Sequence, residues 1–477
     1  MPKEEFYDLH PFGWESDPEV ERSKLSALDY TAVMSYNHFA LFFRLDDAAK
    51  PGAVETLKAG LERTLAQVRH LNGRIEKDPR GGHSFTKRKD DTVRFVVQWL
   101  DDPEDAGKYP SFDDMERAHF TALSLGDPGL WAVEPMTYGY TPEAALEQNP
   151  VTSAFKANFV RGGLVLSTHS HHAAADVMGW AGFVHQLAEN CCALATGAAY
   201  PAWDPACLGI SRLLKPEPPE ELKVEGPPPS DMDPGHLGCC SSYLFHLPKS
   251  KAARLKELAR PEDGTWVSTY DAFSAFIWRH LTRLRAPAYN PAPDSKLLYA
   301  ETVDMRRRMH SPKPPARIQQ NFAFVALSRM APVVQPTVSE LISEWPFWKV
   351  ARYIRQLTDS VTQERLDVAL TMAAMIRDKS SLSIRPHAGP PMAVGQTDQR
   401  SAEITTADFG FAKPATYRYL VGEATNNLIF VYPSRDPSPE SDEGSEFVIM
   451  YETDLAQALI DDPIWNQFFE YRGINSK

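Results

Sequence analysis

Three histidines and one aspartate lie within residues 169–176, which read His-Ser-His-His-Ala-Ala-Ala-Asp. They form the densest group of reactive side chains in the chain. A neutral imidazole has a reference pKa of ~6.5, which suits it to take a proton from a hydroxyl or an amine near neutral pH. This cluster is therefore the first candidate for catalysis.

The cluster is open to three interpretations. A metal site would use His169 and His171 on one strand face, but the dinuclear His-x-His-x-Asp-His pattern needs an acid where Ala173 stands. A purely structural role is the second interpretation. The third is a general base, His172, followed four residues later by Asp176. On a helix the two would share one face, whereas in a turn Asp176 would point away and anchor the loop through a cation.

Other catalytic motifs are missing from the sequence. It contains no Gly-x-Ser-x-Gly, no Gly-x-Gly-x-x-Gly and no P-loop. A histidine base without an evident protein nucleophile points to direct transfer, in which the base activates an acceptor and the acceptor attacks an activated acyl group.

Composition narrows the class of protein. The 477 residues carry 50 Lys and Arg against 63 Asp and Glu, a net charge of −13. Such a chain is a poor general binder of nucleic acids or anionic membranes, although a local pocket for a small anion is still allowed. Five cysteines without a Cys-x-x-Cys, no apolar run of about 18 residues and no signal-peptide core predict an intracellular, cytoplasmic protein.

Hydrophobic periodicity places the cluster between a strand at 153–168 and a helix at 179–194. Elsewhere the pattern predicts strands at 31–45, 75–100 and 446–451 and helices at 53–70, 268–285, 351–378 and 456–471. Helices and strands alternate, which indicates an α/β fold. The loop that joins a strand to a helix is a common place for functional residues on such scaffolds.

Residues 214–238 contain seven prolines. Proline fixes φ and lacks a donor, so this stretch cannot be a regular element. We expect a crossover linker between an N-terminal domain, 1–213, and a C-terminal domain, 239–477. A long surface loop within one domain is the alternative.

Several segments carry a family resemblance. Residues 172–176 resemble the His-x-x-x-Asp motif of BAHD acyltransferases, which transfer acyl groups from coenzyme A, and with His171 they are also similar to the double-histidine motif of condensation domains. Residues 408–414, Asp-Phe-Gly-Phe-Ala-Lys-Pro, resemble the second BAHD motif. Residues 303–308 and 268–279 are similar to two further family segments. The chain is identified as similar to BAHD members, the fungal ones above all.

The resemblance implies a fold of two pseudo-equivalent, chloramphenicol-acetyltransferase-like α/β domains. Each would be a mixed β-sheet with flanking helices, and a long crossover would join them. Acyl-CoA and acceptor would enter a channel between the domains from opposite faces. Val177 departs from the glycine that usually follows the motif aspartate, with Gly179 two residues later.

The resemblance also implies roles for individual residues. His172 would be the general base, with no covalent acyl-enzyme and no metal, and Asp176 would pair with an arginine, Arg306 first and Arg308 second. The remaining expected residues support the site (Asp408, Gly410), bind coenzyme A (Lys256, Arg260, Ser268, Thr269) or line the reaction chamber (His171, Thr397).

The expected activity is transfer of an acyl group, most simply acetyl, from acyl-CoA to a hydroxyl of a small secondary metabolite by a monomeric enzyme. N-acylation, a condensation-type enzyme that uses a carrier-protein thioester, and an inactive binding module are the alternatives.

Overall fold

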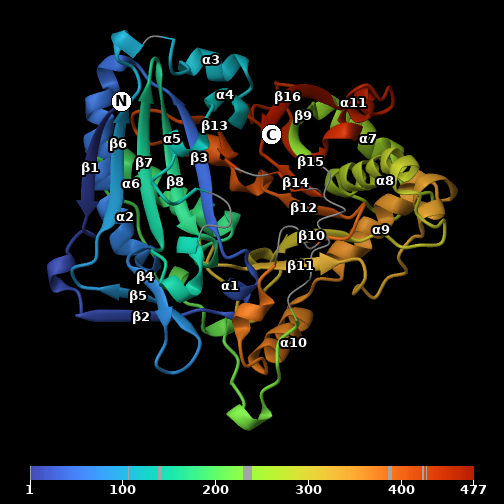
Figure 1. Cartoon of the computed structure of the whole chain (residues 1–477), viewed down its shortest axis with the longest axis horizontal. Coiled ribbons are helices and arrows are strands. Elements are labelled where there is room, and N and C mark those ends of the chain that lie inside the picture. The colour runs from blue at the N-terminus through green and yellow to red at the C-terminus, as the bar shows by residue number, and fades with distance from the viewer. Residues whose placement is uncertain are drawn as a thin grey trace.

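The computed structural model describes residues 2–105, 107–137, 142–228, 239–384, 389–421, 424–425 and 427–476. Two large mixed β-sheets lie side by side, and helices cover them (Figure 1). A small sheet of β2 (Val20–Lys24), β5 (His83–Arg88) and β4 (Arg74–Lys77) lies below the first large sheet. The chain therefore has the predicted α/β class.

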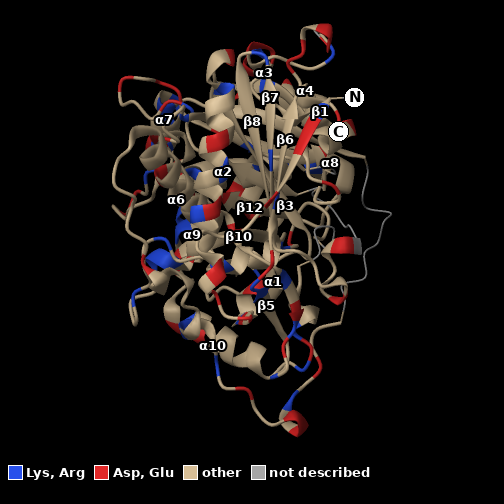
Figure 2. Cartoon of the chain, turned by 90° about the vertical axis from the view of Figure 1, so that its left-hand side faces the viewer, with Lys and Arg blue, Asp and Glu red and all other residues tan. Residues whose placement is uncertain are grey.

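The first large sheet has the strand order β1-β6-β7-β8-β3-β13, with β6 and β7 parallel and the other neighbours antiparallel. Its strands are β1 (Lys3–Leu9), β6 (Val93–Trp99), β7 (Ser153–Val160), β8 (Gly163–His171), β3 (Tyr36–Arg44) and β13 (Pro414–Tyr419). The stretch predicted as one strand, 153–168, forms two strands, β7 and β8, joined by a turn at which Gly162 has a φ of +70°. All of β8 is buried and it carries no charged residue, as Figure 2 shows.

Two long helices, α2 (Lys50–Gln67) and α6 (Val177–Thr196), pack together on one face of this sheet. Their contact is close at Gly60, where a Cβ would lie 2.3 Å from Cys191 Sγ. Four short helices belong to the same half: α1 (Ala27–Thr31), α3 (Phe112–Arg117), α4 (Ala122–Leu125) and α5 (Pro128–Trp131).

The second large sheet has the order β11-β10-β12-β14-β15-β9-β16. Its strands are β11 (Ala323–Leu327), β10 (Tyr299–Asp304), β12 (Val394–Asp398), β14 (Leu428–Val431), β15 (Ser445–Glu452), β9 (Cys240–Leu247) and β16 (Glu470–Ser476). The helices of this half are α7 (Lys249–Leu258), α8 (Thr269–Tyr289), α9 (Phe347–Asp359), α10 (Gln363–Ala374) and α11 (Thr453–Ile460).

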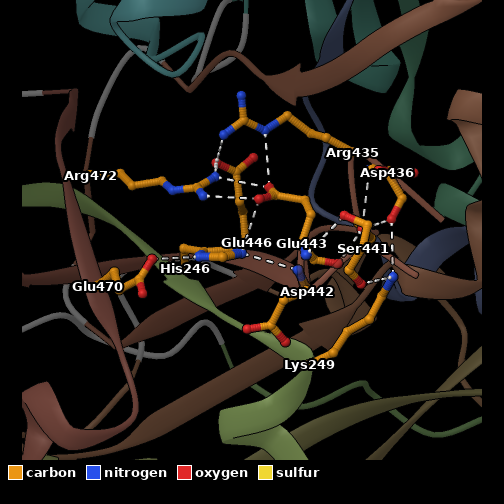
Figure 3. A network of polar contacts seen from close by, with 12 residues as sticks. His246, Lys249, Arg435, Asp436, Ser441, Asp442, Glu443, Glu446, Glu470 and Arg472 are labelled. Carbon is orange, nitrogen blue, oxygen red and sulfur yellow. Dashed lines mark hydrogen bonds and ion pairs between the residues drawn. The ribbon is translucent and has the colours of Figure 1, made fainter. Parts of the chain in front are cut away.

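One strand crosses between the halves. β13 follows β12 in the chain yet pairs with β3 in the first sheet. From β13, Arg418 Nη2 donates to Glu446 Oε2 on β15 at 2.5 Å, and both side chains are fully buried. Arg435 and Arg472 also bind Glu446 (Figure 3). Burial opposes the charge of Glu446, but the three arginines lower its pKa to about 2.

The proline-rich stretch is extended with short 3-10 turns over 214–228, whereas its remaining residues, 229–238, lie outside the described part of the chain. A division of the chain into domains at this stretch stays a prediction. The first sheet is completed by β13, a strand from beyond the proline-rich stretch. No pattern in the sequence predicted this pairing.

The predicted terminal helix at 456–471 is wrong. α11 ends at Ile460, and β16 begins at Glu470 and pairs with β9. Pro463 explains the break, because proline cannot donate to a helical carbonyl and disfavours helical geometry in the residue before it. None of the described helices is long and apolar enough to span a lipid bilayer.

Candidate active site

The histidine cluster lies where β8 meets α6. β8 ends at His171, and His172–Ala174 form a single 3-10 turn. Asp176 then caps α6, accepting a hydrogen bond from the Gly179 backbone N–H at 2.8 Å. A carboxylate at this position stabilises the first turn of a helix. Asp176 therefore lies in a turn before the helix and not on its face.

The carboxylate of Asp176 points toward the second half of the chain. Its Oδ2 accepts from Arg306 Nη1 at 2.9 Å and from the Phe322 N–H at 2.7 Å. Arg306 also donates to the carbonyls of Ile318 and Gln320 at 3.1 and 2.9 Å. Burial opposes its charge, yet the carboxylates beside it raise the pKa of Arg306 above its ordinary value.

Arg308, the second candidate partner of Asp176, lies elsewhere. Its Nη1 donates to the Val361 carbonyl at 2.9 Å, and its nearest carboxylate is that of Asp359, at 3.9 Å. Of the two arginines that the sequence offered, the structure pairs Arg306 with Asp176.

The imidazole of His172 is half-buried, and its Nδ1 is buried without a hydrogen-bond partner among the described residues. Burial lowers the pKa of His172 below its ordinary value, although the carbonyls of His172 and Ala175 and the charge of Asp176 act in the opposite direction. The ring is therefore neutral near pH 7. Because Nδ1 is buried, Nε2 is left as the nitrogen that a substrate would approach.

The two other histidines are held inside the protein. The buried Nε2 of His171 lies 2.9 Å from the Ala144 carbonyl, and its Nδ1 accepts from the Ala173 N–H at 3.2 Å. His169 Nε2 accepts from the Val133 N–H at 3.1 Å. Burial lowers the pKa of His171 to about 4 and that of His169 to about 3. Both nitrogens of His171, predicted to line the chamber, are thus used within the protein.

Within the described part of the chain, no group of three or more His, Cys, Asp or Glu side chains is placed to hold a metal ion. Thr397, the other predicted chamber residue, is half-buried on β12 and lies opposite Thr302 of β10. β10 leads directly into the turn that carries Arg306.

The four residues predicted to bind coenzyme A lie on α7, on the segment after it and at the start of α8. Ser268 caps α8 in a capping box with Asp271, and Thr269 is the first residue of that helix. Lys256 Nζ lies 5.5 Å from the centre of the exposed Trp266 ring. Arg260 is exposed and bound to the Glu257 carboxylate.

Asp408 and Gly410 are positioned far from His172. Gly410 has a φ of +80°, its N–H donates to Asp408 Oδ1 at 2.9 Å, and a Cβ there would lie 2.6 Å from Ala195 Cβ. Ala195 belongs to the last turn of α6, whereas His172 precedes the first. A helix of 20 residues is roughly 30 Å long, so the motif packs at the opposite end of α6.

Two residues that contact the turn were not among the expected site residues. Asn321 Nδ2 lies 3.0 Å from the His172 carbonyl, and His70 Nε2 lies 3.0 Å from the Ala174 carbonyl. In the sequence, Asn321 belongs only to the continuation of the family-like segment 303–308, which says nothing about what its side chain binds.

Comparison with known proteins gives matches along the whole chain. The profile of the Transferase family matches residues 133–456, and that of the trichothecene 3-O-acetyltransferase-like N-terminal domain matches residues 35–191. Acetyltransferase FGR3 of Gibberella zeae is 62% identical over 476 residues, which are 100% of this chain and 95% of that protein. Trichothecene 3-O-acetyltransferase TRI101 of Fusarium sporotrichioides is 23% identical over 459 residues, 92% of this chain and 94% of that protein.

A solved structure has the same fold. The structure of F. graminearum TRI101 complexed with coenzyme A and T-2 mycotoxin superposes with a TM-score of 0.76 at 20% identity, and the match covers 95% of this chain and 100% of that one. At this identity the likeness concerns the arrangement of the two sheets and their helices.

Proposed function

The chain belongs to the Transferase family of BAHD acyltransferases and is an acyltransferase, and we propose that it acetylates a hydroxyl of a small secondary metabolite from acetyl-CoA with His172 as the general base. Two relatives support the reaction and the donor: one is named an acetyltransferase, and the other, TRI101, has been crystallised with coenzyme A and a mycotoxin.

The observation that carries this proposal is the separation of His172 from Asp176. Arg306, Phe322 and Gly179 satisfy the carboxylate, so it orients the turn and takes no part in a relay. The imidazole is neutral and its Nδ1 is buried, which leaves Nε2 for the acceptor. A neutral base at the end of a rigid strand is the group that direct acyl transfer requires.

The reaction then needs one base and no covalent enzyme intermediate. His172 Nε2 takes the proton of the acceptor hydroxyl, and the oxygen forms a bond to the thioester carbonyl carbon. The tetrahedral oxyanion collapses, the C–S bond breaks, and the imidazolium returns its proton to the departing thiolate. We assign Thr397 to the wall of the chamber beside the oxyanion, because polar donors there stabilise the charge that develops.

For the donor we propose a site at the start of α8. Lys256 and Arg260 supply positive charge, while Ser268 and Thr269 belong to a helix N-terminus, which favours phosphate oxygens. Among the described residues Lys256 forms no ion pair, so its charge is free for a phosphate. Asp408 and Gly410 support α6. We further propose that the enzyme acts as a monomer in the cytoplasm and uses no metal.

The test is acetyl transfer by purified protein, followed as release of the coenzyme A thiol with a panel of alcohols and amines. His172→Ala should abolish transfer while calorimetry still shows coenzyme A binding. The matched control is His185→Ala, because His185 is also half-buried but lies within α6 and its Nε2 lies 2.9 Å from the Ala402 carbonyl. Transfer by His172→Ala at the wild-type rate would overturn the assignment. Transfer only from a carrier-protein thioester, or only to amines, would favour the alternatives.

A further inference from the structure

The carbonyls of the catalytic turn, 172–174, are bound by side chains from distant segments. Asn321 Nδ2 lies 3.0 Å from the first carbonyl, that of His172, and 2.9 Å from the second, that of Ala173. His70 Nε2 lies 3.0 Å from the third. The carbonyls of a turn that precedes a helix cap have no hydrogen-bond partner within the turn. Donors from other segments of the chain therefore determine how rigidly the turn is held.

Asn321 is itself oriented by a buried carboxylate. Asp29 Oδ1 accepts from Asn321 Nδ2 at 3.0 Å and from the Asn321 N–H at 3.3 Å, while Oδ2 accepts from the Ser26 N–H at 2.7 Å. Asp29 is fully buried. A carboxylate and two carbonyls are all acceptors, so only the amide nitrogen of Asn321 fits among them. Asp29 thus fixes the direction in which Asn321 points.

The residues on either side of Asn321 contact the two residues that follow the turn, Ala175 and Asp176. The Gln320 carbonyl accepts from Arg306, Gln320 forms a bridge with Ala175, and the Phe322 N–H donates to Asp176. Gln320 has a φ of +68°, a left-handed conformation that costs a non-glycine residue about 1–2 kcal/mol. Three consecutive residues therefore contact residues 172–176, and the first of them has a backbone geometry that persists only where its surroundings enforce it.

We propose that Asn321, aimed by Asp29, is a positioning residue for His172. It holds the carbonyls of the turn so that the imidazole keeps the place from which Nε2 takes the acceptor proton. This role rests on the proposed function of His172. Asn321 donates to the backbone of His172 and not to its ring. It therefore fixes the position of the imidazole, whereas the pKa of the imidazole is set by the other groups around the ring.

The first test is Asn321→Ala. Losing a group that orients a catalytic residue typically costs 10–100-fold, so kcat should fall by about that factor, while KM for acetyl-CoA stays within about twofold. The matched control is Asn158→Ala, because Asn158 is also fully buried and donates to a backbone carbonyl, that of Val165 at 3.1 Å, within the first sheet. It should lower the Tm and leave kcat unchanged.

An exchange of the two side chains separates positioning from folding. Asn321→Asp alone sets two carboxylates against each other and should lower both Tm and kcat. Adding Asp29→Asn restores one amide–carboxylate pair, so part of the lost Tm should return, although the carboxylate at 321 still faces the carbonyls of His172 and Ala173. kcat should stay low, because a carboxylate at 321 cannot donate to the carbonyls of His172 and Ala173. Recovery of kcat together with the Tm would show that the pair serves folding alone and would overturn the proposal.

A readout without turnover keeps this test separate from the proposed function. In protein labelled with ¹³C-histidine, the ring signal of His172 can be assigned by its loss in His172→Gln. It should shift or broaden in Asn321→Ala and in the exchanged pair, and stay in place in Asn158→Ala. An unmoved signal in an active enzyme refutes the role of Asn321. An inactive wild type with the predicted signal changes refutes only the proposed reaction.

Discussion

Arg306 Nη1 lies 2.9 Å from Asp176 Oδ2, with both side chains buried, and the pair joins the two halves of the molecule directly behind the catalytic turn. The carboxylate is fully occupied by this arginine and by two backbone N–H groups. Asp176 therefore maintains the conformation of the turn. Its substitution should affect catalysis less than the loss of a residue that relays a proton to the base.

Asp176→Asn should lower kcat by about 10–100-fold and reduce the Tm. The variant retains a helix cap but leaves the buried Arg306 with Asp304, at 3.2 Å, as its remaining carboxylate partner, and removing one partner of a buried pair costs up to about 3–5 kcal/mol. Were Asp176 a relay to the base, the loss would approach 10⁴-fold. Arg308→Ala is the control, since Arg308 bonds the Val361 carbonyl, and its kcat should match the wild type. Steady-state kinetics and thermal melts distinguish the two roles.

The acid limb of kcat/KM should have its midpoint below pH 6.5. His172, the proposed base, would act in its neutral form, and burial lowers the pKa of its imidazole, so we expect protonation to inactivate the enzyme only at more acidic pH than for a free histidine. Rates at constant ionic strength between pH 4.5 and 8 measure the midpoint. A midpoint above 6.5 would contradict the burial of the ring as the dominant influence.

The free energy of unfolding should fall as the pH drops from about 6.5 toward 4. Burial lowers the pKa of His171 and of His70 to about 4, so over this range the unfolded chain binds protons that the folded chain does not. Stability is complete above the unfolded pKa and decreases below it, by up to about 3 kcal/mol for each histidine. Urea titrations at several pH values measure the slope, and His171→Gln should make it shallower. A flat profile would contradict the prediction.

Gly410→Ala should destabilise the protein by roughly 2–4 kcal/mol through left-handed strain and overpacking against α6. Gly197→Ala is the matched control, because Gly197 has a φ of +70° but nothing within 4 Å of the added Cβ, so it incurs the strain alone. Chemical denaturation measures both variants. Equal losses would show that the contact with Ala195 is unimportant. Well below the Tm, kcat of Gly410→Ala should equal that of the wild type.

Lys256→Ala should raise KM for acetyl-CoA by about 5–10-fold, with kcat within about twofold, because an exposed contact to a phosphate is worth on the order of 1 kcal/mol. Lys251→Ala is the control on the same helix, since Lys251 is bound to Glu470 and faces another surface element. KM for acetyl-pantetheine, which lacks the nucleotide, should be the same in both variants. A rise in KM for both donors would place Lys256 away from the phosphates.

Local patterns predicted the elements that surround the site. The glycine pair between β7 and β8, the apolar stripe of α2 and the capping box of α8 each lie within a few residues, and each element formed where its pattern indicated. The helix predicted over 456–471 failed because buried aromatic residues near its end, Phe468 and Phe469, mimic helical spacing while Pro463 breaks the helix.

The sequence predicted the residues His172 and Asp176 but not the geometry that relates them. His172 and Asp176 lie close together in the chain, but their spacing fits both a helix face and a turn. The choice depends on Arg306, 130 residues from Asp176, and on Asn321, 149 residues from His172. Contacts over such separations leave no trace in local periodicity, because they arise from how the two sheets pack.

The pairing of β13 with β3 constrains the order in which the first sheet can form during synthesis. β3 cannot acquire its outer neighbour until residues 414–419 have left the ribosome, long after the rest of the first sheet has emerged. Until then the backbone of β3 is an unpaired edge, which invites pairing with other chains. The late strand also brings Arg418 to Glu446, which Arg435 and Arg472 bind as well. The first sheet, which carries the turn 172–174, is therefore completed only near the end of synthesis, because contacts between residues far apart in the chain form only after long loops close.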